Sequence, residues 1–343
     1  MLIALAVGGG MRVPRAAAPA RSADSFARIV DSPGARFSQA RLARSGVTWI
    51  GGPTTAATGE VVTVYVSTSL GPQFGTPQTW ADFFAGLVHG GELSSLTAYV
   101  ATLAEVREIC AGEHVLGCYG SSRLVTLGEV LSWAVPTEVA THEYGHHVAT
   151  NRDNHPWLSV EWGTKRWASV ANVCARAAAG AVFPGDEGDH YTLNPGEGFA
   201  EVYRATNESK KGALSFNWQV VDPSFYPSPA ALKAAEQDVL QPWTAPTTKV
   251  VRAQFLPKGK RTWTLLVATP LDGELTVTLS FPKGRADRLT LLGPDGKTVL
   301  ATGLWSATTV KAVSYAVCGQ RSVIVNVSLV GSPGRFAVLV AKP

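Results

Sequence analysis

His142 and His146 stand four residues apart and flank Glu143 in the sequence His-Glu-Tyr-Gly-His. An α-helix turns about 100° per residue, so residues four apart lie on one face and both imidazoles can reach a single ion. The intervening glutamate lies beside such an ion, where its carboxylate can take a proton from water. The spacing predicts a zinc-binding helix with Glu143 as a general base. Pro136 breaks the preceding segment, and Thr137 is expected to be the N-cap of this helix.

The third protein ligand decides the kind of zinc site, because three ligands leave a position open for catalysis and four close it. One group of zinc peptidases, the metzincins, takes a glycine and a further histidine from the same segment. Here Ala149 and Arg152 stand at those positions. A second acidic segment begins 51 residues beyond His146, at Glu197, after a Pro-Gly pair that suits a helix start. Glu197 and Glu201 are again four residues apart, so one carboxylate can bind the ion while the other, most naturally Glu201, orients a histidine.

Tyr191 precedes Glu197 by six residues and could direct its phenol at the oxyanion that forms when a carbonyl is attacked. The neighbouring His190 could do the same. Together with the HExxH run, Tyr191, Asn194 and the Glu-Gly-Phe-Ala-Glu sequence at 197–201 resemble the gluzincin metallopeptidases. The resemblance is greatest to the catalytic domain of the anthrax lethal factor-like group, and it covers about residues 140–205.

This resemblance implies a zinc peptidase that acts on a peptide or protein substrate. It implies that His142, His146 and Glu197 bind the zinc ion. It also implies that Glu143 is the general base and that Tyr191 stabilises the transition state.

Three alternatives to a zinc peptidase stay open. An HExxH string can arise by chance on a solvated helix face. The chain can also be an adhesion or binding protein whose zincin-like domain is catalytically vestigial and whose C-terminal domain carries the function. A zinc site of this kind can act on a non-peptide amide or ester as well, because activated water attacks any such carbonyl.

The composition is that of a folded protein rather than a disordered one. The chain has 343 residues, of which 45% are hydrophobic and 16% are charged, and it is long enough for two domains. Its net charge of +4 comes from 30 basic and 26 acidic residues spread along the sequence, which does not indicate nucleic-acid binding. No apolar run reaches the roughly 18 residues needed to span a membrane. We expect a monomer.

Several features predict a secreted protein. Residues 1–24 resemble the latter part of a secretory signal or a flexible leader, because a short apolar run precedes a small-residue stretch at 16–20. The four cysteines agree with an oxidising compartment. Cys110 and Cys118 enclose a short loop that a disulfide can close. A second bridge between Cys174 and Cys318 would join two domains.

The expected fold class is α+β, with a zincin-like mixed sheet and helices over residues 25–244 and an all-β sandwich over residues 249–343. The first domain is expected to have strands at 60–67, 96–102 and 123–127, and helices at 76–87, 103–110, 166–179 and 230–240. The segment 122–127, just before the metal helix, is expected to be an edge strand that pairs with extended substrate. Seven Val, Leu and Thr-rich runs predict the sandwich, at 250–255, 262–268, 274–281, 289–292, 310–317, 322–329 and 336–340.

Overall fold

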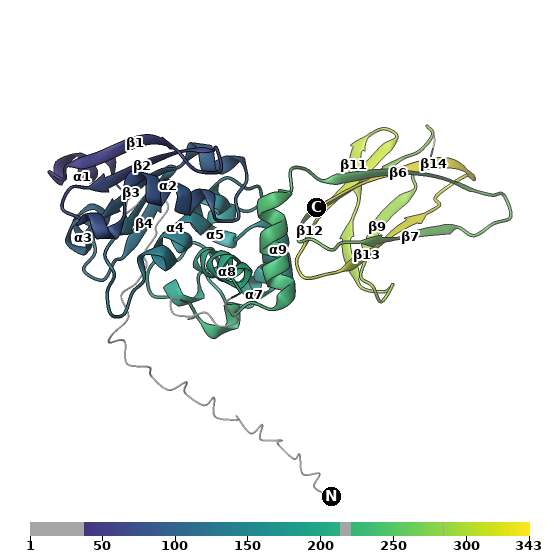
Figure 1. Cartoon of the computed structure of the whole chain (residues 1–343). Coiled ribbons are helices and arrows are strands. Elements are labelled where there is room, and N and C mark those ends of the chain that lie inside the picture. The colour runs from purple at the N-terminus through teal and green to yellow at the C-terminus, as the bar shows by residue number, and fades with distance from the viewer. Residues whose placement is uncertain (1–37, 213–220, 284) are drawn as a thin grey trace, which may run out of the picture.

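The computed structural model describes residues 38–212, 221–283 and 285–343. Figure 1 shows two parts, the first built from helices around a sheet and the second from strands. Each part has its own apolar core. The fold class is therefore α+β followed by an all-β part, as the sequence predicted. The leader expected at residues 1–24 lies outside the described residues.

A five-stranded mixed sheet organises the first part. Its strands are β1 Trp49–Thr55, β2 Val61–Ser67, β3 Thr97–Ala101, β4 Gly117–Gly120 and β5 Arg123–Leu127. They lie in the order β1-β2-β3-β5-β4, with β2, β3 and β5 parallel and the two outer strands antiparallel. Because side chains alternate along a strand, Leu124 enters the main core on one face while Val125 enters a smaller core on the other.

Helices cover both faces of this sheet. They are α1 Gln39–Arg44, α2 Pro77–Ala85, α3 Leu103–Cys110 and α4 Pro136–Thr150, with short 3-10 turns η1 Pro72–Phe74 and η2 Gly91–Ser95. Residues of α2 and α4 pack in the main core, and residues of α1 and α3 pack in the smaller one. The expected cap of α4 is wrong by two residues, since the helix begins at Pro136 and Val135 is its N-cap.

The prediction that residues 122–127 form an edge strand is wrong. β5 is an inner strand, bonded to β3 on one side and to β4 on the other. The reversal between β4 and β5 is very tight, because Ser121 and Ser122 both adopt positive φ, at 51° and 61°. Two serines in this conformation are uncommon, so the sequence carried no recognisable turn signal there. β4 forms the edge instead, and its residues are buried.

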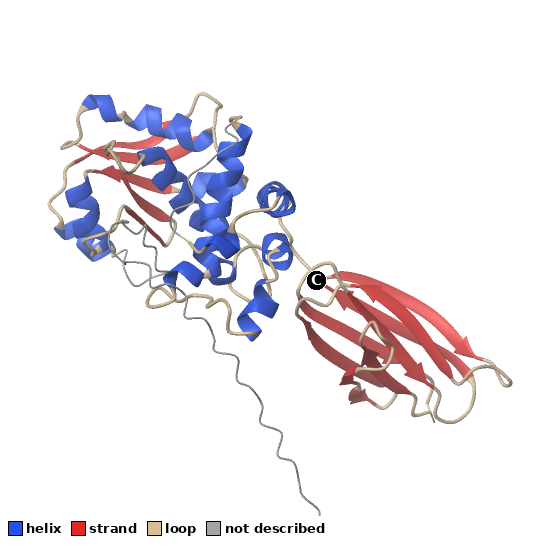
Figure 2. Ribbon diagram, turned by 90° about the horizontal axis from the view of Figure 1, so that it is seen from below, coloured by secondary structure: helices blue, strands red, loops and turns tan. Residues whose placement is uncertain are grey.

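The described residues of the first part form five further helices: α5 Ser159–Trp162, α6 Lys165–Val170, α7 Val173–Ala178, α8 Pro195–Lys210 and α9 Pro229–Leu240, with η3 Tyr191–Leu193 and η4 Pro223–Phe225. The single helix expected at 166–179 is divided into α6 and α7, because Asn172 adopts a left-handed conformation with φ of 51°. Figure 2 shows these helices grouped beside the sheet. No helix in the described part of the chain is long and apolar enough to cross a bilayer.

The second part consists of two antiparallel sheets, seen as two layers of strands in Figure 2. One has the strand order β10-β9-β13-β7 and the other β11-β12-β8-β14-β6. All seven expected strands are present, and the short β10 and β11 are additional. The bounds are β6 Thr247–Phe255, β7 Thr262–Ala268, β8 Gly273–Ser280, β9 Arg288–Leu292, β10 Val299–Thr302, β11 Leu304–Ala307, β12 Val310–Val317, β13 Ser322–Ser328 and β14 Gly334–Lys342.

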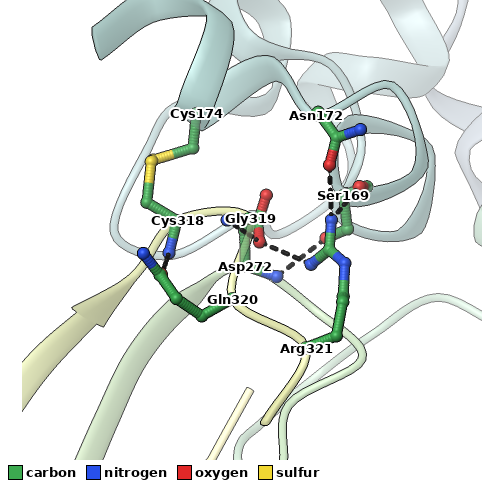
Figure 3. The surroundings of a disulfide bond; sticks show 8 residues. All are labelled: Ser169, Asn172, Cys174, Asp272, Cys318, Gly319, Gln320 and Arg321. Carbon is green, nitrogen blue, oxygen red and sulfur yellow. Dashed lines mark hydrogen bonds and ion pairs between the residues drawn. A yellow bond between two sulfur atoms is a disulfide. The ribbon is translucent and has the colours of Figure 1, made fainter. Parts of the chain in front are cut away.

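The expected disulfide between Cys110 and Cys118 forms, and so does the second bridge that the sequence allowed. Cys110 at the end of α3 is bonded to Cys118 in β4, and Cys174 in α7 is bonded to Cys318 just after β12. The second bridge joins the two parts of the molecule (Figure 3). Beside it, Arg321 donates to Asp272 Oδ1 at 2.7 Å and to the Ser169 carbonyl at 2.6 Å. The junction between the parts is thus covalent and hydrogen-bonded.

Candidate metal centre

The candidate site lies where α4 crosses α8. The crossing is close, because a Cβ added to Gly145 would lie 2.8 Å from the Cα of Ala200. A larger side chain at position 145 would therefore push the two helices apart. The close approach places His142 and His146 of α4 opposite Glu197 of α8, although Glu197 lies 51 positions after His146 in the sequence.

The three side chains present their donor atoms to one point. His142 Nε2 lies 3.1 Å from His146 Nε2 and 3.2 Å from Glu197 Oε2, and His146 Nε2 lies 3.6 Å from Glu197 Oε1. Tetrahedral zinc with bonds of about 2.0–2.1 Å holds its ligand atoms about 3.3 Å apart. The observed separations match that value, so these residues fit a zinc ion. Among the described residues, these three side chains form a cluster whose donor atoms are close enough together to bind one metal ion, and all three are buried.

Glu201 and Arg204 orient His142 from behind. Glu201 Oε1 lies 2.9 Å from His142 Nδ1, the ring nitrogen that faces away from Glu197. Arg204 in turn donates from Nε and Nη2 to the same carboxylate, at 3.1 Å and 2.8 Å. Such contacts to the second ring nitrogen set the tautomer of a metal-binding histidine. Sequence reasoning found Glu201 but missed Arg204, although its position three residues along α8 could have indicated an ion pair.

The pKa values of this cluster reflect burial and mutual charge. Burial lowers the pKa of His142, but hydrogen bonds to Glu197 and Glu201 outweigh it and raise that pKa to about 9. Burial raises the pKa of Glu197, but His146 and His142 lower it to about 2. The pKa of Glu201 also falls to about 2, because Arg204 and His142 outweigh its burial. Both carboxylates are therefore ionised at neutral pH, as metal binding and orientation require.

Glu143 is fully buried between α4 and the edge strand β4. A Cβ added to Gly117 would lie 2.6 Å from Glu143 Oε1, so the carboxylate lies directly against the backbone of β4. Only glycine leaves room there for the glutamate in this position. Sequence reasoning missed Gly117, because nothing in the local pattern indicates that a strand glycine approaches a helix residue.

Tyr191 lies at the site, but its phenol contacts a ligand. Its hydroxyl donates to Glu197 Oε2 at 2.7 Å. Burial, followed by the charge of Glu197, raises the pKa of Tyr191 well above its usual value, so the phenol keeps its proton. The structure thus brings Tyr191 to the cluster, whereas His190 lies outside it, 2.8 Å from Asp186. Asn194 caps α8 by accepting from the Gly196 N–H at 3.0 Å.

No protein-family model and no curated protein matches this chain. Solved structures resemble the C-terminal β part alone. The pre-peptidase C-terminal domain of a collagenase from Bacillus anthracis is 13% identical, covers 27% of this chain and 88% of its own length, and has a TM-score of 0.23. A Yersinia pseudotuberculosis-derived mitogen is 14% identical over 29% of this chain and 87% of its own length, also with a TM-score of 0.23.

The third structure is the Aeromonas hydrophila protein PliG, a periplasmic inhibitor of g-type lysozyme. It is 10% identical over 28% of this chain and 86% of its own length, with a TM-score of 0.21. Likenesses this remote carry no argument about function. The buried His142, His146 and Glu197 group on α4 and α8 is consistent with a zincin-like site on its own geometry.

Proposed function

We propose that this protein is an exported zinc metallopeptidase of the gluzincin type. The observation that supports the proposal most strongly is the set of three buried donor atoms, 3.1–3.6 Å apart, on two crossing helices. A zinc ion held by His142, His146 and Glu197 would supply Lewis-acid activation of water and of a scissile carbonyl. The two disulfides support an oxidising compartment and hence export.

The residues of the chain then have separate tasks. Glu143 takes a proton from the attacking water and later delivers it to the leaving amine, which is general base and general acid chemistry by one carboxylate. Gly117 leaves the space in which that carboxylate lies. Glu201 holds the ring of His142, and Arg204 holds Glu201. Tyr191 holds Glu197, and its further task in this proposal is to donate to the oxyanion that develops on the attacked carbonyl.

A direct test combines metal analysis with proteolysis. The purified full-length protein should contain one zinc per chain after dialysis and should digest casein. A chelator should stop the digestion, and added zinc should restore it. A protein that binds zinc but leaves casein and peptide libraries intact would be a hydrolase of another carbonyl or a vestigial zincin, and one that binds no zinc would lack the site altogether.

Zinc affinity is expected to rise with pH. In the metal-free protein His142 has a pKa of about 9, so below that pH zinc must displace a proton. A single displaced proton makes the affinity increase roughly tenfold per pH unit, or about a hundredfold between pH 6.5 and 8.5. The stability that protonated His142 gives the metal-free fold is present below pH 6.5 and is lost as the pH rises through about 9. Competition with a chromophoric chelator measures the affinity, and a flat profile would contradict the assignment.

Arg204 is expected to act on zinc binding through Glu201. Replacing Arg204 by Met removes the cation that orients and ionises the Glu201 carboxylate, and contacts of this kind are worth about 10–100-fold in metal affinity. Zinc titration should show that loss with the same stoichiometry. The matched control is Glu208→Gln, which removes the other carboxylate that accepts from Arg204 and leaves the Glu201 contact intact. Equal losses in both variants would mean a general packing effect.

A further inference from the structure

Charge is distributed unevenly between the two parts of the molecule, in contrast to the even spread expected from the sequence. From Lys249 to the C-terminus the chain has 13 lysines and arginines against 4 aspartates and glutamates, whereas the residues before it have 17 against 22. The β part is therefore strongly cationic, while the part with the candidate metal centre is acidic. The overall net charge of +4 conceals this difference.

The cations gather at one end of the β part, which we call the distal tip. It comprises residues 256–261, 281–283, 285–288, 304–311 and 329–335. Hydrogen bonds join these segments: the Leu329 N–H donates to the Arg261 carbonyl at 2.8 Å, and the Phe281 N–H to the Thr309 carbonyl at 3.0 Å. Figure 1 shows the hairpin between β6 and β7 at the end farthest from the helices. The opposite end holds Cys318 and Arg321, which contact the first part.

The distal tip has basic side chains but no exposed carboxylate among its described residues. Asp287 is the acidic residue of these segments, and it is buried and paired with Arg285. The remaining cations form no ion pair with a described residue, and all but the half-buried Lys311 are exposed: Lys258, Lys260, Arg261, Lys283, Arg288, Lys311 and Arg335.

Large apolar side chains are exposed on the same tip. The exposed fractions are 57% for Leu256, 43% for Val330, 74% for Leu304 and 52% for Trp305. Lys311 lies over the ring of Trp305, with its Nζ 4.5 Å from the ring centroid. Leu256 begins the hairpin sequence Leu-Pro-Lys-Gly-Lys-Arg, so an apolar residue and three cations share one short loop. The tip therefore combines unpaired positive charge with aliphatic and indole groups.

We propose that the distal tip binds an anionic lipid surface. Lysine and arginine near such a surface are attracted by its negative potential, and tryptophan and aliphatic groups enter the boundary between headgroups and acyl chains. A soluble polyanion would account for the cations, but it would gain nothing from exposed Leu256 and Leu304. This apolar component is the reason to favour a bilayer over nucleic acid or an acidic polysaccharide. The proposal does not depend on the metal centre.

The test is sedimentation of the full-length protein with two kinds of vesicle. One consists of phosphatidylcholine alone, and the other contains about 30 mol% of the anionic lipid phosphatidylserine. Binding is expected only to the anionic vesicles, and it should weaken as salt rises. Each cation near the surface contributes about fivefold in binding, so Lys258→Gln with Lys260→Gln should weaken binding about 25-fold. The matched control pairs Lys249→Gln with Lys297→Gln, which are exposed on the β part outside the distal tip.

A second pair of variants distinguishes a bilayer from a soluble polyanion. Leu256→Ser with Trp305→Ser should weaken binding to anionic vesicles while leaving retention on a heparin column unchanged. The lipid proposal is wrong, and the tip is a polyanion site, if the Leu256 and Trp305 variant changes neither vesicle binding nor heparin retention while the lysine variant weakens both measurements. Equal binding to neutral and anionic vesicles, or equal losses in the Lys249 and Lys297 control, would also overturn it. Circular dichroism of each variant verifies the fold.

Discussion

Glu143→Gln is expected to remove at least 99% of the peptide hydrolysis, a loss of about 10²–10⁴-fold, while leaving zinc binding intact. General base catalysis contributes about 10²–10⁴-fold to a rate, so kcat should fall by that factor. Glutamine has the shape of glutamate, so we expect it to fit the tight space beside Gly117. The zinc ligands are untouched, because Glu143 is not among the three residues that group around one point.

Zinc content by mass spectrometry and kcat on a fluorogenic peptide measure the two effects on the same preparation. Glu138→Gln is the matched control, since it makes the same change earlier on α4 and outside the metal group. It should retain both zinc and activity. Wild-type hydrolysis by Glu143→Gln would disprove the base assignment, whereas loss of zinc in that variant would mean that the carboxylate helps to bind the metal.

Glu197→Ala is expected to lose tight zinc binding, and activity with it. Removing a residue that only orients a ligand costs about 10–100-fold in metal affinity, so removing a ligand should cost more than about 100-fold. The two histidines that remain are the pair that any isolated HExxH helix offers. The loss therefore measures what the crossing of α4 and α8 adds to the motif.

Equilibrium dialysis gives the zinc affinity, and thermal unfolding gives an independent readout. Zinc should raise the Tm of the wild-type protein and should not raise that of the variant, because a ligand that binds only the folded state stabilises it. Glu208→Gln on the same helix is the control and should behave as the wild type. An unchanged zinc affinity in Glu197→Ala would place the metal elsewhere and would end the gluzincin proposal.

Much of this could be predicted because the signals are local. The HExxH spacing needs only a helix to place two imidazoles on one face, and that helix formed over Pro136–Thr150. The β runs after Lys249 are separated by strong turn residues, so all seven predicted strands are present. The short loop between Cys110 and Cys118 likewise made one disulfide predictable. In each case the residues concerned are close in sequence.

The errors have the opposite character. The segment 122–127 has the residue pattern of a strand, but that pattern does not distinguish an inner strand from an edge strand. Ser121 and Ser122 are not typical turn residues, so the sequence did not indicate the tight turn that pairs β4 with β5. The division of the helix expected at 166–179 depends on the left-handed conformation of Asn172, which the helical pattern of the sequence does not indicate.

The sequence by itself determined which reactive groups the protein has: two imidazoles and a carboxylate in helical spacing, a second acidic helix and four cysteines. Only the tertiary structure decided which of them meet. The close contact of Gly145 with Ala200 brings Glu197 to the histidines, and Gly117 lies against Glu143 from a strand that is remote in sequence. Contacts of this kind depend on packing between elements, and the sequence period of one element carries no information about its neighbour. The cations of the distal tip follow the same rule, because loops far apart in sequence become one surface only when the two sheets pack.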